Sequence, residues 1–104
     1  MSKVSIKQRV SLREVFTMTN DAKEKYDLEC QVTVDNKQLI SINAISCNTK
    51  DGRQLFFGDS SAGQITGTMS GDAENPNAVI IGTVEEFVNM VKEFDFTNDK
   101  KEEE

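Results

Sequence analysis

The sequence of 104 residues contains no histidine and no tryptophan, and it has only two cysteines and one proline. Without histidine, the chain cannot form a Ser-His-Asp triad, a Cys-His pair or a histidine-containing zinc site. Two cysteines are also too few for a four-cysteine zinc site. The segment around Ser60 resembles a serine-nucleophile turn only in composition, because no histidine is present to take the hydroxyl proton. We therefore expect no enzymatic activity, no cofactor and no metal site.

Long apolar runs are also absent. The longest, residues 78–81, contains four residues, whereas a transmembrane helix needs about 20. Residues 1–3 lead into a segment of alternating polar and apolar residues, which differs from the apolar core of a secretion signal. The expected localisation is therefore cytoplasmic, and we expect no membrane partner.

Alternation of apolar and polar residues predicts a β-hairpin in the middle of the chain. Residues 28–34 have the pattern of a half-buried strand, and residues 38–47 have the pattern of the returning strand. A three-residue turn pairs Val32 with Ile40 and matches the apolar faces, whereas a two-residue turn pairs Val32 with Ser41. We therefore expect the three-residue turn.

This register also predicts the state of the two cysteines. It pairs Cys30 with Ile42, and it places Cys30 and Cys47 on opposite faces and about five residues out of alignment. That separation exceeds the limit of about 7 Å between the Cα atoms of a disulfide. Free thiols are expected, which agrees with a reducing cytosol.

The composition predicts one small globular domain with a C-terminal tail. Hydrophobic residues make up 37% of the chain and charged residues 29%, as in ordinary soluble domains. We expect residues 1–97 to form a single α+β domain, in which an antiparallel, bent sheet of about five strands carries one amphipathic C-terminal helix. Residues 98–104 contain no apolar side chain and are predicted to form a disordered acidic tail.

Local patterns place the other elements. Alternation predicts a strand over residues 4–12, and a capping box over residues 11–14 predicts that this strand passes into a short helix. A second capping box over residues 83–86 begins the helix that we expect over residues 83–95. The remaining elements are expected to be a turn over 48–52, a strand at 55–57, a turn over 58–63, a strand over 63–71, a loop over 72–77 and a buried strand over 78–81.

Charge divides between the two halves of the chain. Residues 1–53 carry 9 basic and 7 acidic side chains, a net charge of +2, and residues 54–104 carry 3 and 11, a net charge of −8. The basic excess comes mainly from four residues of one parity, which a strand would place on one face: Lys3, Lys7, Arg9 and Arg13. This basic face can contact phosphates or carboxylates, or it can be a solvated face that protects a sheet edge from aggregation. The acidic tail is either solubilising or folds back on the basic face and competes with an anionic ligand.

Two further features are candidate binding surfaces. Phe56 and Phe57 can stack on single-stranded bases if they are exposed, or they belong to the core. Residues 63–71 alternate glycine and apolar positions with polar ones, including Thr66 and Thr68. This pattern is typical of an exposed edge to which a partner strand can add, and it also fits glycines that make room for an aromatic ring.

These observations predict a small, non-enzymatic, cytosolic binding protein that acts on a protein partner as an accessory or inhibitory module. The alternative is a single-stranded nucleic-acid-binding protein that uses the N-terminal basic face and exposed aromatic residues. The expected binding residues under either hypothesis are Lys3, Lys7, Arg9, Arg13, Phe56, Phe57, Thr66 and Thr68. The sequence does not determine the oligomeric state, the strand order or the partner's identity.

Overall fold

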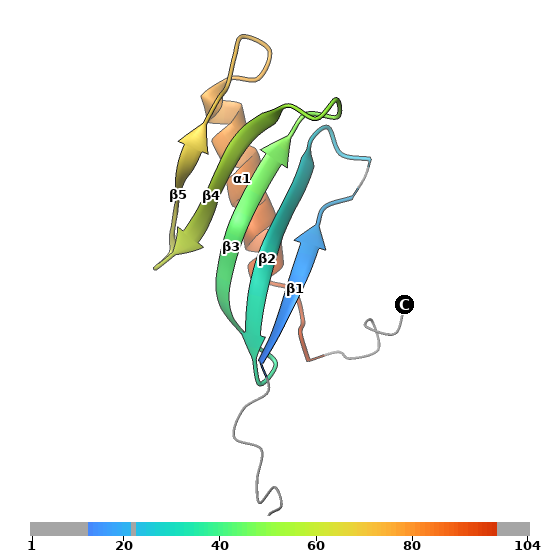
Figure 1. The fold of residues 1–104 in the computed structure, drawn as a ribbon, viewed down its shortest axis with the longest axis vertical. Coiled ribbons are helices and arrows are strands. Elements are labelled where there is room, and N and C mark those ends of the chain that lie inside the picture. The colour runs from blue at the N-terminus through green and yellow to red at the C-terminus, as the bar shows by residue number, and fades with distance from the viewer. Residues whose placement is uncertain (1–12, 22, 98–104) are drawn as a thin grey trace, which may run out of the picture.

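The fold is one antiparallel sheet with one helix packed on it, shown in Figure 1 by a computed structural model that describes residues 13–21 and 23–97. The strands follow the chain across the sheet in the order β1-β2-β3-β4-β5, and each pairs with the next. The helix α1 lies behind β3, β4 and β5. The elements are β1 (Arg13–Thr19), β2 (Asp27–Asp35), β3 (Gln38–Asn48), β4 (Gln54–Ser61), β5 (Gln64–Met69) and α1 (Asn77–Lys92). The predicted α+β fold is confirmed.

The core lies between the sheet and α1. Alternate residues of β2 are buried, as the period-two pattern predicts, and the helix buries one stripe against the sheet. The other face of the sheet, which we call the outer face, has no helix on it in the described part of the chain. The buried apolar residues are Tyr26, Leu28, Cys30, Val32, Val34, Ile42, Ile45, Cys47, Leu55, Phe56, Ile80, Val84, Phe87, Val88, Val91 and Phe96.

The β2–β3 hairpin uses the two-residue turn, so the predicted register is wrong. Asn36 and Lys37 have φ angles of 54° and 68°, as in a type I′ turn. The apolar faces still match, because a shift in register beside the turn brings Val32 opposite Ile42. An unbroken strand would have turned the wrong face inward, and the β-bulge removes that conflict.

A second irregularity in β3 places both cysteines on the core face, so the prediction of opposite faces is wrong. Ala44 has a φ angle of 52°, and the register shifts again beside it, so that Leu28 lies opposite Cys47. Cys30 and Cys47 are both buried, free thiols. Burial raises the pKa of each thiol from 9.0 to about 11, and the nearby Glu29 carboxylate adds to the shift at Cys30. Both cysteines are therefore protonated at neutral pH.

The β4–β5 hairpin is tighter than predicted. The expected turn over residues 58–63 is wrong, because β4 continues to Ser61 and only Ala62 and Gly63 form the loop. Their φ angles are 52° and 80°, which again fits a type I′ turn. The turn expected over residues 48–52 joins β3 to β4, and there the Thr49 N–H donates to the Arg53 carbonyl at 2.8 Å.

The helix begins earlier than the capping box predicted. α1 starts at Asn77, so the strand predicted over residues 78–81 is wrong and the helix predicted over residues 83–95 starts too late. Pro76 precedes the first turn with a φ angle of −64°, and its missing N–H is not needed there. The Thr83 hydroxyl caps nothing; it donates to the Val79 carbonyl one turn back, at 2.9 Å.

The four-residue apolar run is the first turn of the helical stripe. Its residue Ile80 lies one turn before Val84 and is fully buried. A short apolar run fits a buried helix and a buried strand equally well, which explains the error. Phe94 belongs to the helix expected over residues 83–95, but it lies beyond the end of α1 and is partly exposed. Its ring contacts Phe96 edge-on, at 4.8 Å between centroids. The ring of Phe96 in turn stacks on Phe16 of β1, at 6.2 Å.

The first described element corrects another prediction. Residues 13–19 form β1, and they do not form the short helix that the first capping box predicted. The strand expected over residues 4–12 and the tail expected over residues 98–104 lie outside the described residues. Within the described ranges, no helix is long and apolar enough to cross a membrane.

Candidate functional site

The outer face of the sheet is largely polar and is built in rows across the strands. One row follows the strand pairing from β1 to β5: Thr19, Glu29, Ser46, Phe57 and Thr68. Most residues of this face have hydroxyl or amide side chains. The row ends at the β5 edge with an aromatic ring beside a threonine, and this end is the candidate site.

Phe57 points outward because the two residues before it point inward. Leu55 and Phe56 are consecutive, yet both are buried. The register between β3 and β4 shifts between Cys47 and Asn48, opposite this position, which is a β-bulge. Phe57 then falls on the outer face, where 47% of its surface is exposed.

Two glycines of the β4–β5 hairpin make room for the ring of Phe56. Gly58 and Gly67 lie opposite each other, and a Cβ built on either of them would lie 2.9 Å from the tip of the Phe56 ring. The interpretation that the glycines make room for an aromatic ring is therefore supported by the geometry. It does not compete with an exposed edge, because the ring lies beside the glycine pair, whereas an added strand would bind the outward-facing backbone groups of β5.

The edge of β5 presents backbone groups in a known order. The Ser70 N–H donates to the Leu55 carbonyl at 2.8 Å, so residues of even number in β5 direct their N–H and C=O groups toward β4. The odd residues Ile65, Gly67 and Met69 direct theirs away from the sheet. These three residues form a hydrogen-bonding edge that no other described strand covers.

A groove runs beside this edge, between β5 and α1. It has a volume of about 490 Å³. Ile65 and Val88 supply its apolar part, and Glu85, Asn89 and Lys92 of α1 supply charged and amide groups. Side chains of a strand added beside β5 would alternate between this groove and the outer face.

The structure brings together three of the predicted binding residues and separates the others. Thr66, Thr68 and Phe57 share the outer face of β4 and β5. Phe56 is buried, so it cannot stack on a base. Arg13 lies on the opposite edge strand, where its guanidinium lies 3.5 Å from the Asp35 carboxylate. The remaining predicted residues, Lys3, Lys7 and Arg9, lie outside the described residues.

The outer face is acidic rather than basic. The strand residues on this face include the cation Arg13 and four carboxylates: Asp27, Glu29, Asp35 and Asp59. The Asp27 carboxylate lies 2.6 Å from the Lys50 ammonium, and the Asp59 carboxylate accepts the Ala44 N–H at 2.9 Å. This distribution disfavours a phosphate backbone on the described part of the face.

Metal and nucleophile chemistry finds no support in the described part of the chain. There, no three Cys, Asp or Glu side chains gather to hold a metal ion. The two thiols are buried and protonated, which disfavours them as nucleophiles. The Asp72 carboxylate has a lowered pKa because it accepts N–H bonds from Asn75 and Glu74 and lies beside Arg53, and these contacts fix the loop before α1.

Sequence reasoning missed the helical side of the groove. Glu85, Asn89 and Lys92 recur at positions i, i+4 and i+7, which places them on one stripe of α1. This polar stripe was visible in the sequence, but only the structure shows that it borders an open sheet edge. Met69 was missed because strand position alone does not show which backbone groups face outward. No family model, no curated protein and no solved structure matches this chain.

Proposed function

We propose that the protein is a non-catalytic cytoplasmic binding module that accepts an extended segment of a protein partner as an additional strand beside β5. The observation that carries this proposal is the chemistry of the β5 edge. The strand Gln64–Met69 contains no charged residue and no proline, and no described strand pairs with its three outward-facing backbone positions. It would act as an accessory or inhibitory module, because it supplies binding without a reaction.

Edge strands of monomeric proteins are normally protected against pairing. Charged side chains, proline and bulges are the usual devices. The other edge, β1, carries Arg13 and Glu14, which form ion pairs with Asp35 and Lys37. The contrast between the two edges supports β5 as the edge that is used for binding.

Side chains beside the edge supply specificity. An added strand gains main-chain hydrogen bonds from β5, and its alternate side chains reach two different surroundings. On one side lies the groove with Ile65, Val88 and the polar stripe of α1. On the other side lies the exposed ring of Phe57 beside Thr66 and Thr68. An amphipathic partner segment fits both sides, with its apolar residues over Phe57 or the apolar floor of the groove.

Single-stranded nucleic acid is the alternative ligand. The exposure of Phe57 favours it, because an aromatic ring on a sheet can stack on a base. The burial of Phe56 and the acidic outer face argue against it. Titration with single-stranded DNA and RNA at two salt concentrations separates the hypotheses, since nucleic-acid binding weakens steeply with salt and strand addition does not.

Selection of a random peptide library on the full chain tests the proposal directly. The Met69→Pro variant removes one outward N–H and leaves the hydrogen bonds between β4 and β5 in place. Peptides that bind the original chain are expected to lose affinity for this variant by about tenfold, the value of one backbone hydrogen bond of about 1.4 kcal/mol. Bound peptide should also slow amide exchange at Ile65 and Gly67.

The matched control is Met69→Ala, which shortens the side chain and keeps the N–H. It is expected to change peptide affinity by less than about threefold, since Met69 is at the strand end and partly exposed. Equal losses in the two variants would assign the effect to the side chain and contradict strand addition. The proposal would also fail if no peptide is enriched.

A further inference from the structure

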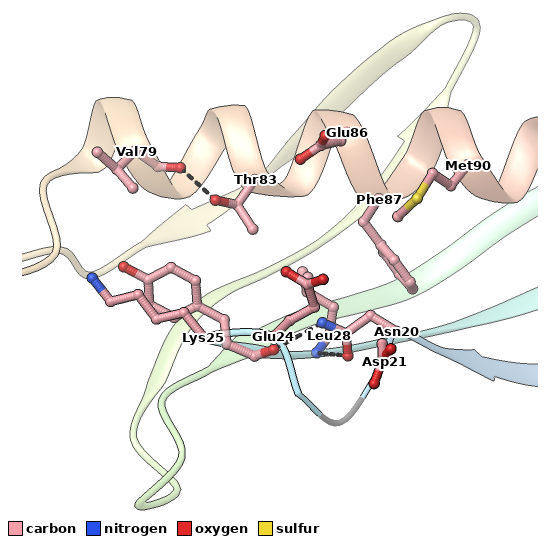
Figure 2. Close-up of a pocket in the computed structure, with 11 residues that line it drawn as sticks. Asn20, Asp21, Glu24, Lys25, Leu28, Val79, Thr83, Glu86, Phe87 and Met90 are labelled. Carbon is pink, nitrogen blue, oxygen red and sulfur yellow. Dashed lines mark hydrogen bonds between the residues drawn. The ribbon is translucent and has the colours of Figure 1, made fainter.

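A second groove lies on the other side of the helix, between α1 and the loop that joins β1 to β2. It has a volume of about 440 Å³. Figure 2 shows its two walls: one turn after another of α1 on one side, and the loop residues on the other. Tyr26, Leu28 and Phe87 supply apolar surface in it, and Val79 and Met90 remain about half exposed, at 47% and 53%.

Carboxylates dominate the rim of this groove. Asp21 and Glu24 project from the loop and Glu86 projects from the helix. Lys25 is the cation among the lining residues, and its ammonium lies over the ring of Tyr26, 5.3 Å from the centroid. The rim therefore carries three negative charges and one positive charge. A basic, partly apolar segment is the ligand that complements it.

Residues 1–12 of the same chain have this chemistry. They contain three basic side chains and no acidic one: Lys3, Lys7 and Arg9. Four apolar residues of the segment fall on the other parity: Val4, Ile6, Val10 and Leu12. In an extended conformation, such a segment presents one apolar side to the groove floor and basic side chains to the rim.

The position of Arg13 allows the segment to return to the groove. β1 begins at Arg13, opposite Asp35, the last residue of β2, so β2 offers no neighbouring strand to the residues before Arg13. Twelve residues reach at most about 40 Å when extended, and β1 is roughly 24 Å long. The segment is therefore long enough to run back along β1 to the loop at residues 20–26.

We propose that residues 1–12 dock in cis into the groove between α1 and the β1–β2 loop, with their basic side chains on the acidic rim. Docking would cover the exposed surface of Val79 and Met90. It would also neutralise the basic face that the nucleic-acid hypothesis requires. The proposal does not depend on the β5 edge, which lies on the far side of α1.

Paramagnetic relaxation in the full chain tests this docking. A spin label is attached to the Ser5→Cys variant; the native thiols are buried and have pKa values of about 11, so the introduced cysteine reacts first. The amide signals of Val79, Thr83 and Met90 are expected to lose more than half of their intensity. The signals of Thr66 and Thr68 are expected to remain, because β5 is remote from the groove.

Two neighbouring glutamates of α1 provide a matched control. Glu86→Lys reverses a charge on the groove, whereas Glu85→Lys reverses the same charge on the opposite groove. The signals are expected to return in the Glu86 variant and to stay weak in the Glu85 variant. Undiminished signals in the labelled chain would overturn the proposal. Equal responses to the two reversals would overturn it as well, and so would broadening that appears only between labelled and unlabelled copies, which would assign the groove to a second chain.

Discussion

At the scale of single residues, the pairing of β4 with β5 requires glycine at two positions, because there is no room for a side chain. Gly58 and Gly67 approach each other across the pair, and a Cβ on Gly67 would lie 2.7 Å from the Gly58 Cα and 2.9 Å from the Phe56 ring. The backbone carbonyl of Phe57 would be closer still. Because backbone atoms cannot move aside, the position admits only glycine. By contrast, a Cβ on Gly82 of α1 would meet nothing within 4 Å.

These two glycines give substitutions of opposite sign. Gly67→Ala is expected to lower the free energy of unfolding by about 1–3 kcal/mol, because the methyl group overpacks the sheet. Gly82→Ala is expected to raise it by about 0.5–1 kcal/mol, because alanine favours a helix and the site is open. Urea unfolding of both variants measures the difference. A neutral Gly67→Ala would show that Phe56 does not lie over the glycine pair.

At the scale of elements, the sequence predicted the type of most strands and missed several boundaries. Alternation identified β2, β3 and β5; β2 and β3 bury one face and expose the other, whereas in β5 only Ile65 is partly buried. The predicted register of the β2–β3 hairpin was wrong because it assumed an unbroken period of two, whereas the shift beside the turn and the irregularity at Ala44 change the parity of the buried positions of β3. The predicted start of α1 was wrong because Pro76 precedes the helix without a side-chain cap, while the capping box that was used for the prediction lies inside the helix.

The candidate site was also predictable only in part, because alternation along a strand assigns residues to a face but does not show bulges or packing. Thr66 and Thr68 follow from strand parity, and the structure places them beside Phe57. The separation of Phe56 from Phe57 follows from a bulge, which the sequence does not reveal. The groove walls depend on how α1 packs against the sheet, so they could not be inferred from local patterns.

The tight turn between β4 and β5 contains a residue that is poorly suited to it. Ala62 has a φ angle of 52°. Residues with a Cβ are strained at this angle, although asparagine tolerates it better than alanine, and glycine, which has no Cβ, adopts it freely. Ala62→Asn is expected to raise the free energy of unfolding by about 0.5–1 kcal/mol, measured by thermal or urea unfolding. Ala73→Asn is the control, since Ala73 is exposed and is not among the positive-φ residues. Equal effects of the two substitutions would contradict the strained turn.

At the scale of the whole molecule, the sheet is open and has two edges that differ in protection. Neighbours in the sequence are neighbours in the sheet, so each strand pairs with the one that follows it. β2, β3 and β4 have partners on both sides, whereas β1 and β5 have a partner on one side. The helix packs on β3, β4 and β5, and the segment that contains Phe96 covers the inner side of β1 through the stacked Phe16 ring. The faces of the edge strands are thus partly covered, but their backbone edges are not covered by any described element.

Amide hydrogen exchange should reveal both edges by an alternating pattern. In β5, the Thr66 and Thr68 amides point toward β4 and are expected to exchange slowly, whereas the Ile65 and Gly67 amides point outward and should exchange near the rate of an unfolded chain. In β1, the Asn20 N–H donates to the Leu28 carbonyl at 3.3 Å, which sets the same alternation there.

The difference in exchange between odd and even positions of β5 tests the functional argument. If odd and even positions of β5 were equally slow in dilute protein, the edge would already be covered by another part of the chain or by a second copy. Repeating the measurement at several protein concentrations separates these cases, because only pairing between copies strengthens with concentration. An edge that exchanges quickly at every concentration, and slowly once a selected peptide is added, is the behaviour that strand addition at β5 requires.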